Sequence, residues 1–366
     1  MPQGLAQIAD RPSALALALA LASAATAFRI GPGAAAPAPG AQPMFETLTG
    51  GSTGTPRRIR RSQASWTASF AVNAGLFQIG PGQRVAVLGR LVHSLALYGA
   101  TEALHLGADV HLLDDLRPDR QRKALADTEI SHLYATPAQL RLLVDAAGPV
   151  CAQLRVVLIG GSKLDPALRA AVQALAPHAA VHEFYGAAET SFITLTDAAT
   201  PEGSVGRAYP GVDVDVRCGR IWVRSPYLFD GYAGQDGSAE WQEGWLSVGE
   251  VGRVQGGWLY LSGRAGRMVT VADHNVFPEE VETFMASLAG VGRVAVLPVA
   301  DGRRGSVLVA AVQGDPRQEA AILTALRTRL GPLTAPKAVI WIKVWPELAS
   351  GKTDLAALQQ GLTWPI

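Results

Sequence analysis

The feature that most constrains the fold is a regular alternation of two kinds of segment between residues 84 and 186. Short β-branched runs stand at RVAVLGR (84–90), ADVHLL (108–113), LRVVLIGG (154–161) and AVHEFYG (180–186). Longer Ala/Leu-rich stretches lie between them, at 94–106 and 166–175. Short apolar runs that alternate with helical stretches predict an α/β sheet with mostly parallel strands. We therefore expect a large α/β sheet domain in this part of the chain.

The pattern of the sequence changes after residue 200, from alternating strand-like and helix-like segments to short strand-like runs. GRIWVRS (219–225) and GGWLYLSGR (256–264) are short strand-like runs next to Gly turns, which favour antiparallel pairing. FPEEVETFMASLA (277–289) opens on Pro and two carboxylates, which is typical of a helix start. Strands are expected at 294–300 and 306–312, and a further helix at 317–330. These patterns predict a β-rich segment followed by a small α+β C-terminal domain.

Composition excludes several classes of protein. Hydrophobic residues make up 48% of the 366 residues and charged residues 17%, which excludes wholesale disorder. The net charge of +1 gives no basic excess, so nucleic acid and anionic membrane surfaces are not expected as partners. Cys151 and Cys218 are too few for a disulfide framework or a cysteine zinc site, and we expect a cytoplasmic protein.

An uncharged apolar run, Ser13 to Phe28, lies near the N-terminus. It is shorter than the roughly 18 to 20 residues that cross a bilayer, so no membrane span is expected. A buried Ala/Leu helix is the favoured interpretation. A targeting segment is the alternative, although only Arg11 precedes the run and Asp10 offsets its charge.

Glycines and hydroxyl residues follow one another in LTGGSTGTPR (48–57). Glycines let backbone N–H groups turn inward on a phosphate, and the hydroxyls add donors to the same concavity. The hydroxyl donors are Ser52, Thr53 and Thr55. A basic run follows at once, formed by Arg57, Arg58, Arg60 and Arg61. The segment predicts a phosphate-binding loop, with a flexible Ser/Gly linker as the alternative; no GK[ST] ends it, so it is not a Walker loop.

Four further motifs follow this loop in a fixed order: GGS (160–162), YGAAET (185–190), GWLSVGEVGR (244–253) running on to SGR (262–264), and ASGKTDLAAL (349–358). Together the five segments resemble the adenylate-forming superfamily of acyl-CoA synthetases, peptide-synthetase adenylation domains and luciferases. The resemblance runs from Thr47 to Leu358. It implies a large ATP- and acid-binding domain over 1–263, a hinge at 264–266, and a small mobile C-terminal domain over 267–366 that carries the catalytic lysine.

The resemblance also implies which residues contact the nucleotide. They are Thr49, Gly50, Gly51, Ser52, Thr53, Gly54, Arg57, Gly160, Gly161, Ser162, Tyr185, Gly186, Glu250 and Arg264. The loop at 52–54 would hold the β- and γ-phosphates, with Arg57 in place of the family's Lys. The GGS segment would flank the adenine and Tyr185 would stack on it, core packing of this Tyr being the alternative. Glu250 replaces the Asp that accepts the ribose hydroxyls, and Arg264 would contact ribose or phosphate.

Three residues carry the implied catalysis. Glu189, together with Thr53, would bind Mg²⁺; a surface carboxylate is the alternative for Glu189. Lys352 would bridge the substrate carboxylate and the α-phosphate, where negative charge accumulates in the reaction. His93 would lie beside the acyl pocket and gate entry of the acid, and a hydrogen-bonded core histidine stays an open alternative.

The implied activity is ATP- and Mg²⁺-dependent conversion of a carboxylic acid to an acyl-adenylate with release of pyrophosphate. Acyl transfer to coenzyme A would follow, and the acid would be a fatty or an aryl acid. Two alternatives stay open. One is transfer to a carrier protein or an amine, and the other is a catalytically weak homologue that serves as a binding or scaffold subunit.

The sequence also departs from the family pattern. The phosphate loop normally follows a long N-terminal subdomain, but here it begins at 48, and we expect a dimer partner or a second protein to cover the apolar surface this leaves. Ala188 replaces the Thr of the family's YGxTE motif, and Glu250 replaces Asp. Asp273 stands where coenzyme A ligases have a Gly beside the pantetheine tunnel. We expect these changes to affect the rate more than the class of reaction.

Overall fold

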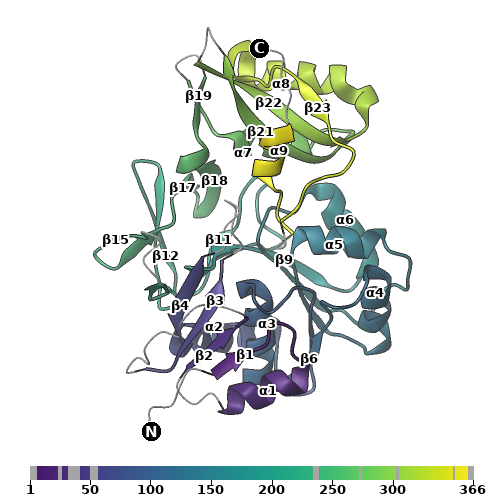
Figure 1. Cartoon of the computed structure of the whole chain (residues 1–366), viewed down its shortest axis with the longest axis vertical. Helices are drawn as coiled ribbons and strands as arrows, with labels where there is room; N and C mark the ends of the chain where they lie inside the picture. The colour runs from purple at the N-terminus through teal and green to yellow at the C-terminus, as the bar shows by residue number, and fades with distance from the viewer. Residues whose placement is uncertain are drawn as a thin grey trace.

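The structure, a computed structural model, describes residues 6–23, 27–31, 42–49, 57–233, 239–271, 274–301, 305–348 and 351–361. The described strands form five sheets, and the elements from residue 269 onward gather at one end of the molecule (Figure 1). This mixed α/β architecture confirms the expected fold class.

A seven-stranded sheet lies at the centre of the fold, in the order β11-β10-β9-β8-β7-β5-β6. Its strands are β5 (Arg84–Val87), β6 (Asp109–Leu112), β7 (His132–Ala135), β8 (Val156–Ile159), β9 (Ala180–Ala187), β10 (Ser191–Leu195) and β11 (Arg207–Ala208). The strands from β5 to β9 pair in parallel, and β10 and β11 are antiparallel. The predicted parallel sheet is therefore confirmed.

Helices cover both faces of this sheet. They are α2 (Gln63–Phe77), α3 (Ser94–His105), α4 (Pro118–Asp127), α5 (Pro137–Asp145) and α6 (Pro166–Leu175). Val85 and Val87 of β5 belong to the apolar cluster that includes α2 and α3, whereas Ala86 belongs to the cluster that includes α4, α5 and α6. Successive side chains of a strand point to opposite faces, so a continuous apolar run buries both.

A five-stranded sheet has the order β1-β2-β3-β4-β14, and its first four strands precede the central sheet in the chain. It consists of β1 (Ala6–Ile8), β2 (Ala27–Ile30), β3 (Met44–Leu48), β4 (Arg58–Ser62) and β14 (Gly231–Tyr232). The strands β1, β2 and β3 pair in parallel, and β4 is antiparallel to β3 and β14. None of these strands is expected from the sequence.

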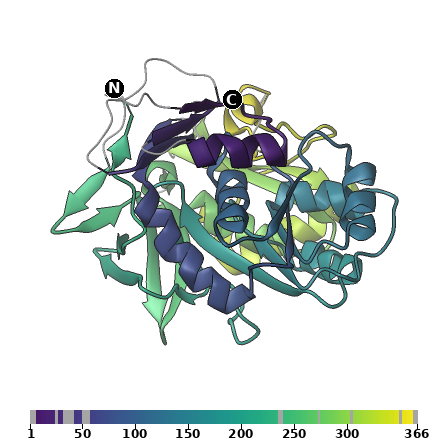
Figure 2. The same cartoon turned by 90° about the horizontal axis from the view of Figure 1, so that it is seen from below.

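The helix expected over 13–28 is wrong at its C-terminal end. Helix α1 spans Ala14–Ser23, and Phe28 lies in β2, where it is buried. Figure 2 shows α1, in purple, beside the strands of the five-stranded sheet. Leu17 is fully buried, but Leu15 and Leu19 are 70% and 62% exposed, so the helix is buried along one side only. Within the described ranges, no helix has the length and apolar character to cross a membrane.

The β-rich segment forms a six-stranded antiparallel sheet. Its strands are β12 (Asp213–Arg217), β13 (Arg220–Arg224), β15 (Glu240–Gln242), β16 (Trp245–Ser247), β17 (Glu250–Gln255) and β18 (Trp258–Arg264). The order is β15-β16-β13-β17-β18, and β12 pairs with β13. This sheet confirms the antiparallel pairing expected after residue 200.

The C-terminal part has its own apolar core, which includes Val271, Val281, Val296 and Leu326. Its elements are β19 (Val269–Val271), β20 (His274–Val276), α7 (Pro278–Ala286), β21 (Val291–Asp301), β22 (Gly305–Gly314), α8 (Glu319–Thr334), β23 (Val339–Trp341) and α9 (Leu355–Gly361). The strands β21 and β22 are antiparallel, and β23 joins β22 in parallel after α8. The division of the chain at residues 264–266 stays a prediction.

A buried carboxyl group makes the stability of this fold depend on pH. Glu102 of α3 is fully buried, and its carboxylate accepts hydrogen bonds from Asn73 Nδ2 (2.8 Å) and the Tyr134 hydroxyl. Burial raises the pKa of Glu102 from 4.5 to about 7. Between these values the folded chain holds a proton that the unfolded chain has lost, so the free energy of unfolding falls as pH rises. The loss across this window is about 3 kcal/mol.

We expect Glu102→Gln to remove this loss, because the amide keeps the shape and an acceptor but does not ionise. Urea unfolding of both proteins at about pH 5 and about pH 8 measures the change, and the wild type should lose about 3 kcal/mol relative to the variant. Equal pH dependence in the two proteins would contradict the assignment.

Candidate active site

The two ends of the predicted phosphate loop are held side by side. Thr49 N donates a hydrogen bond to Arg57 O (2.8 Å), and Arg57 N donates to Thr49 Oγ1 (2.9 Å). These bonds join the end of β3 to the start of β4. The predicted loop residues Gly50, Gly51, Ser52, Thr53 and Gly54 lie outside the described residues.

Glu189 lies in the turn between β9 and β10, where its side chain is largely buried. Its Oε1 accepts from Arg57 Nη2 (3.4 Å) and from the Tyr232 hydroxyl (3.0 Å). The Arg57 guanidinium also lies 4.3 Å from the centre of the Tyr232 ring, a cation–π contact. The structure thus places the arginine at the end of the predicted phosphate loop in contact with the predicted metal ligand. Glu189 is buried, so the alternative that it is a surface carboxylate is wrong.

Tyr232 belongs to β14 and was missed by the sequence analysis. Its hydroxyl contact with Glu189 spans 43 residues, and no motif or spacing in the sequence connects the two positions. The pairing of β14 with β4 is what places the ring beside Arg57.

Gly186 of β9 has a packing reason to be glycine. A Cβ at this position would lie 1.9 Å from the carbonyl oxygen of Ser191, so no side chain fits where β9 and β10 turn back on each other. The close approach forms the turn that carries Glu189.

Tyr185, Glu250 and Arg264 come together from three strands. Glu250 of β17 and Arg264 of β18 are directly paired, and Arg264 Nε lies 3.7 Å from Glu250 Oε1. The Tyr185 hydroxyl donates to Glu250 Oε2. Burial raises the pKa of Glu250, which Arg264 and the Tyr185 bond oppose. The predicted adenine, ribose and phosphate contacts therefore share one region of the fold.

Lys352 approaches this region from the far end of the sequence. Its turn lies against the start of α5, since a Cβ on Gly351 would lie 3.3 Å from the Ala138 Cβ. Burial lowers the pKa of Lys352; Arg264 lowers it further, and the carboxylates of Glu250 and Glu189 raise it. The lysine is thus a half-buried cation within electrostatic reach of the predicted ribose and metal ligands.

His93 precedes the first turn of α3 and is largely buried. Neither ring nitrogen has a hydrogen-bond partner within the part of the chain that the structure describes. Burial lowers the pKa of His93, and the positive charges of Arg90 and Lys352 lower it further. The ring therefore lies on the same side of the fold as Lys352, without the bond that a core histidine makes.

The GGS segment follows β8. A Cβ on Gly160 would lie 2.3 Å from the Phe184 ring, and Gly161 has a φ of +97°, a conformation that favours glycine. Ser162 is exposed. The two glycines thus allow the chain to turn tightly against the ring of Phe184, the residue before Tyr185.

The described residues contain no cluster of three or more His, Cys, Asp or Glu side chains that could hold a metal ion. Mg²⁺ usually binds through one or two carboxylates together with substrate phosphates and water. A single buried carboxylate, Glu189, beside the base of a phosphate loop fits that mode of binding.

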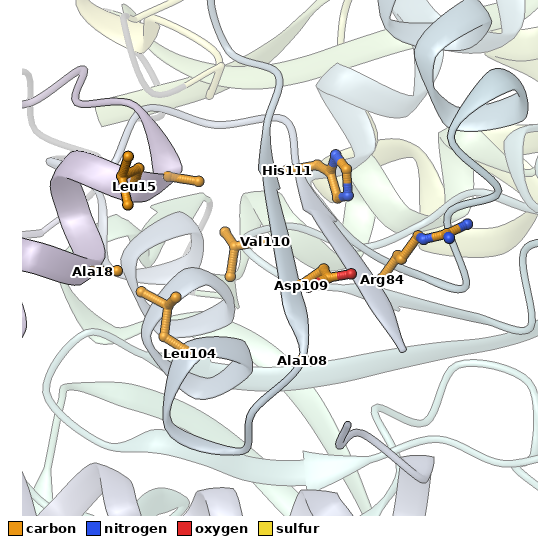
Figure 3. Close-up of a pocket in the computed structure, with 9 residues that line it drawn as sticks. Leu15, Ala18, Arg84, Leu104, Ala108, Asp109, Val110 and His111 are labelled. Atoms are coloured by element: carbon orange, nitrogen blue, oxygen red, sulfur yellow. The ribbon is translucent and has the colours of Figure 1, made fainter. Parts of the chain in front are cut away.

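A hollow of about 420 Å³ lies elsewhere, between α1 and the edge strand β6. Figure 3 shows Leu15 and Ala18 of α1 with Leu104 and Val110 on one side and Arg84, Asp109 and His111 on the other. None of the predicted site residues lines it.

The chain matches two family models, the AMP-binding enzyme family over residues 5–233 and its C-terminal domain over 280–352. It is 31% identical over 336 residues to an uncharacterized acyl–CoA ligase of Bacillus subtilis, YhfT, and the match covers 87% of this chain and 69% of that relative. The chain therefore belongs to the AMP-binding enzymes, the adenylate-forming superfamily that the motifs indicate.

Solved structures show the same fold. ATP-bound MatB from Rhodopseudomonas palustris has a TM-score of 0.77 at 23% identity, over 90% of this chain and 70% of that one. A complex of o-succinylbenzoate coenzyme A synthetase (MenE) from Bacillus subtilis with ATP and a magnesium ion has a TM-score of 0.74 at 22% identity, over 86% and 69%.

Proposed function

We propose that this protein activates a carboxylic acid with ATP and Mg²⁺ and transfers the acyl group to coenzyme A. The observation that carries the proposal is the position of Lys352, a half-buried cation within electrostatic reach of Glu189, Glu250 and Arg264. The relative YhfT is named an acyl–CoA ligase, and MenE binds ATP and magnesium on the same fold.

The first step forms a bond between a carboxylate oxygen of the acid and the α-phosphorus of ATP, and breaks the bond to the leaving pyrophosphate. In the second step the sulfur of coenzyme A attacks the acyl carbon, the thiol loses its proton, and AMP leaves. Both steps develop negative charge on oxygens, which fixed cations stabilise.

Different residues of this chain would bind and stabilise different parts of the substrates. Lys352 would neutralise charge between the acid and the α-phosphate, and Arg57 would face the outer phosphates. Glu250 would accept ribose hydroxyls, with Arg264 beside it. Mg²⁺, held by Glu189 and the phosphates, would supply a Lewis acid that draws charge from the phosphoryl oxygens.

Several finer points belong to the same proposal. Thr53 would share the Mg²⁺ site, His93 would gate the acid, and Gly160, Gly161 and Ser162 would flank the adenine. A rotation of the C-terminal domain about residues 264–266 would switch the enzyme from adenylate formation to thioester formation. Gly266 would permit this rotation, because a residue without a Cβ tolerates large changes of φ. The acid would be a fatty or an aryl acid, and the protein would act in the cytoplasm.

Pyrophosphate release tests the function directly. The protein is given ATP, Mg²⁺ and a panel of fatty and aryl acids, with and without coenzyme A. We expect acid-dependent pyrophosphate release and, with coenzyme A, a thioester. If the protein forms the adenylate but no thioester, and an added amine or carrier protein becomes acylated, then that amine or carrier protein is the acyl acceptor in the second step. No acid-dependent release from any acid would overturn the proposal in favour of a binding or scaffold subunit.

The raised pKa of Glu250 predicts a pH-dependent affinity for ATP. Ribose hydroxyls donate to the ionised carboxylate, so ATP binding should weaken as pH falls through a value above the ordinary glutamate value of 4.5. Glu250→Gln should bind ATP more weakly at neutral pH and lose that pH dependence. Calorimetric titration of both proteins with ATP across acid to neutral pH measures it. An unchanged pH profile in the variant would remove Glu250 as the titrating group.

A further inference from the structure

Arg61 of β4 is a charged side chain with 0% exposure, among the largest fully buried side chains of the described residues. Burial lowers its pKa to about 10, and the nearby carboxylates of Asp230 and Glu189 oppose that shift. The sequence places it in the basic run after the phosphate loop, but the structure buries it in the protein. A buried guanidinium is costly unless its N–H groups find acceptors.

The acceptors of Arg61 lie on both sides of Glu189. Its Nη1 donates to Ala188 O (2.6 Å), and its Nη2 donates to Ser191 Oγ (2.8 Å). Nη2 also donates to Tyr227 O. Two of the three acceptors therefore belong to the turn at residues 188–191, which carries the predicted metal ligand.

The turn has a reason to need such support. Ser191 has a φ of +59°, a left-handed conformation that a serine adopts at a cost of order 1 kcal/mol or more. Trp66 Nε1 donates to the same hydroxyl (3.1 Å), and the Arg61 guanidinium lies 5.7 Å from the centre of the Trp66 ring. The Ser191 side chain is thus held from two directions.

Strand β4 and the residue that precedes it contact the turn with two arginines. Arg57, at the base of the phosphate loop, contacts the carboxylate of Glu189, and Arg61, four residues later, holds the backbone on which that carboxylate stands. One short strand therefore links the phosphate loop to the metal ligand.

We propose that Arg61 is a positioning residue, which fixes the turn at 188–191 so that the Glu189 carboxylate faces Mg²⁺ bound to the ATP phosphates. This inference rests on the proposed function. Lysine cannot replace Arg61, because an ammonium on a flexible stem does not reach three acceptors in the fixed geometry of a planar guanidinium.

The test compares Arg61→Lys with a matched variant, Arg29→Lys. Arg29 is another buried arginine of the same sheet, paired with Glu46 (2.7 Å). Ser191→Ala is a second variant, which removes one acceptor and leaves the guanidinium in place. Calorimetry measures the dissociation constant of ATP with Mg²⁺ and with EDTA, and the ratio of the two is the Mg²⁺ advantage.

We expect Arg61→Lys to reduce the Mg²⁺ advantage about tenfold, a change of about 1.4 kcal/mol, because the Glu189 carboxylate is then no longer fixed toward the ion. Ser191→Ala should reduce it less, and Arg29→Lys should leave it unchanged. Hydrogen exchange of the segment 186–192 should be faster in Arg61→Lys than in Arg29→Lys, whether or not nucleotide binds.

A Mg²⁺ advantage in Arg61→Lys within twofold of wild type overturns the inference, and so does an equal loss in Arg29→Lys, which would mean general destabilisation. If Arg61→Lys does not fold, an unchanged advantage in Ser191→Ala overturns it. Failure of the proposed function is separate: it appears as absent acid-dependent pyrophosphate release by the wild type, while the Mg²⁺ dependence of ATP binding still tests Arg61.

Discussion

Lys352→Ala is expected to reduce acyl-adenylate formation at least about a hundredfold and to change ATP affinity only a few-fold, because the lysine acts where charge develops in the transition state. The side chain is a half-buried cation within electrostatic reach of Arg264, Glu250 and Glu189. Pyrophosphate release in a single turnover, at saturating ATP and acid, measures the rate, and calorimetry measures the ATP affinity.

Lys343→Ala is the matched control, since Lys343 is an exposed lysine of the same C-terminal part. It should adenylate at the wild-type rate. A Lys352→Ala enzyme with near wild-type adenylation would remove Lys352 from the mechanism. A large loss of ATP affinity in that variant would assign the lysine to ground-state binding instead.

Glu189→Gln is expected to slow adenylation about a hundredfold and to raise the Mg²⁺ concentration needed for half-maximal rate, because an amide is a poor Mg²⁺ ligand. The amide oxygen still accepts from the Tyr232 hydroxyl, so the fold should survive. Adenylation rates across a Mg²⁺ titration measure both effects.

Glu240→Gln serves as the control for removal of a carboxylate. Glu240 pairs with Arg220 at the surface of the antiparallel sheet, so its loss should alter neither rate nor Mg²⁺ requirement. A Glu189→Gln enzyme with the wild-type Mg²⁺ requirement would exclude Glu189 as the metal ligand and leave its contact with Arg57 as a structural ion pair.

The central sheet could be predicted from the sequence because its strands are buried on both faces. A run such as VVLI in β8 can be recognised locally, because a short β-branched apolar run bounded by glycine is typical of a strand in the interior of a sheet. The motifs that carry the candidate site could be found for a related reason: each combines glycine with polar residues in a short segment, so it can be recognised without knowledge of the fold.

The five-stranded sheet could not be predicted, because the identity of its strands depends on pairing. Residues 27–30 (AFRI) follow the apolar helix and include Arg29, and the parallel pairing with β3 makes them a strand. RIRRS in β4 is a basic run by sequence, yet Ile59 and Arg61 are buried in it. Composition carries no signal for a strand whose charged side chains point inward.

The sequence by itself determined the family, the parallel sheet and the order of the site motifs, because these depend on residues that are close together in the chain. Only the tertiary structure decided which side chains meet. In the sequence, Arg61 and the turn that carries Glu189 are 127 residues apart, and Lys352 follows both near the C-terminal end. Contacts of this kind are set by how the strands pair and how buried charges find acceptors, and both are properties of the folded chain as a whole.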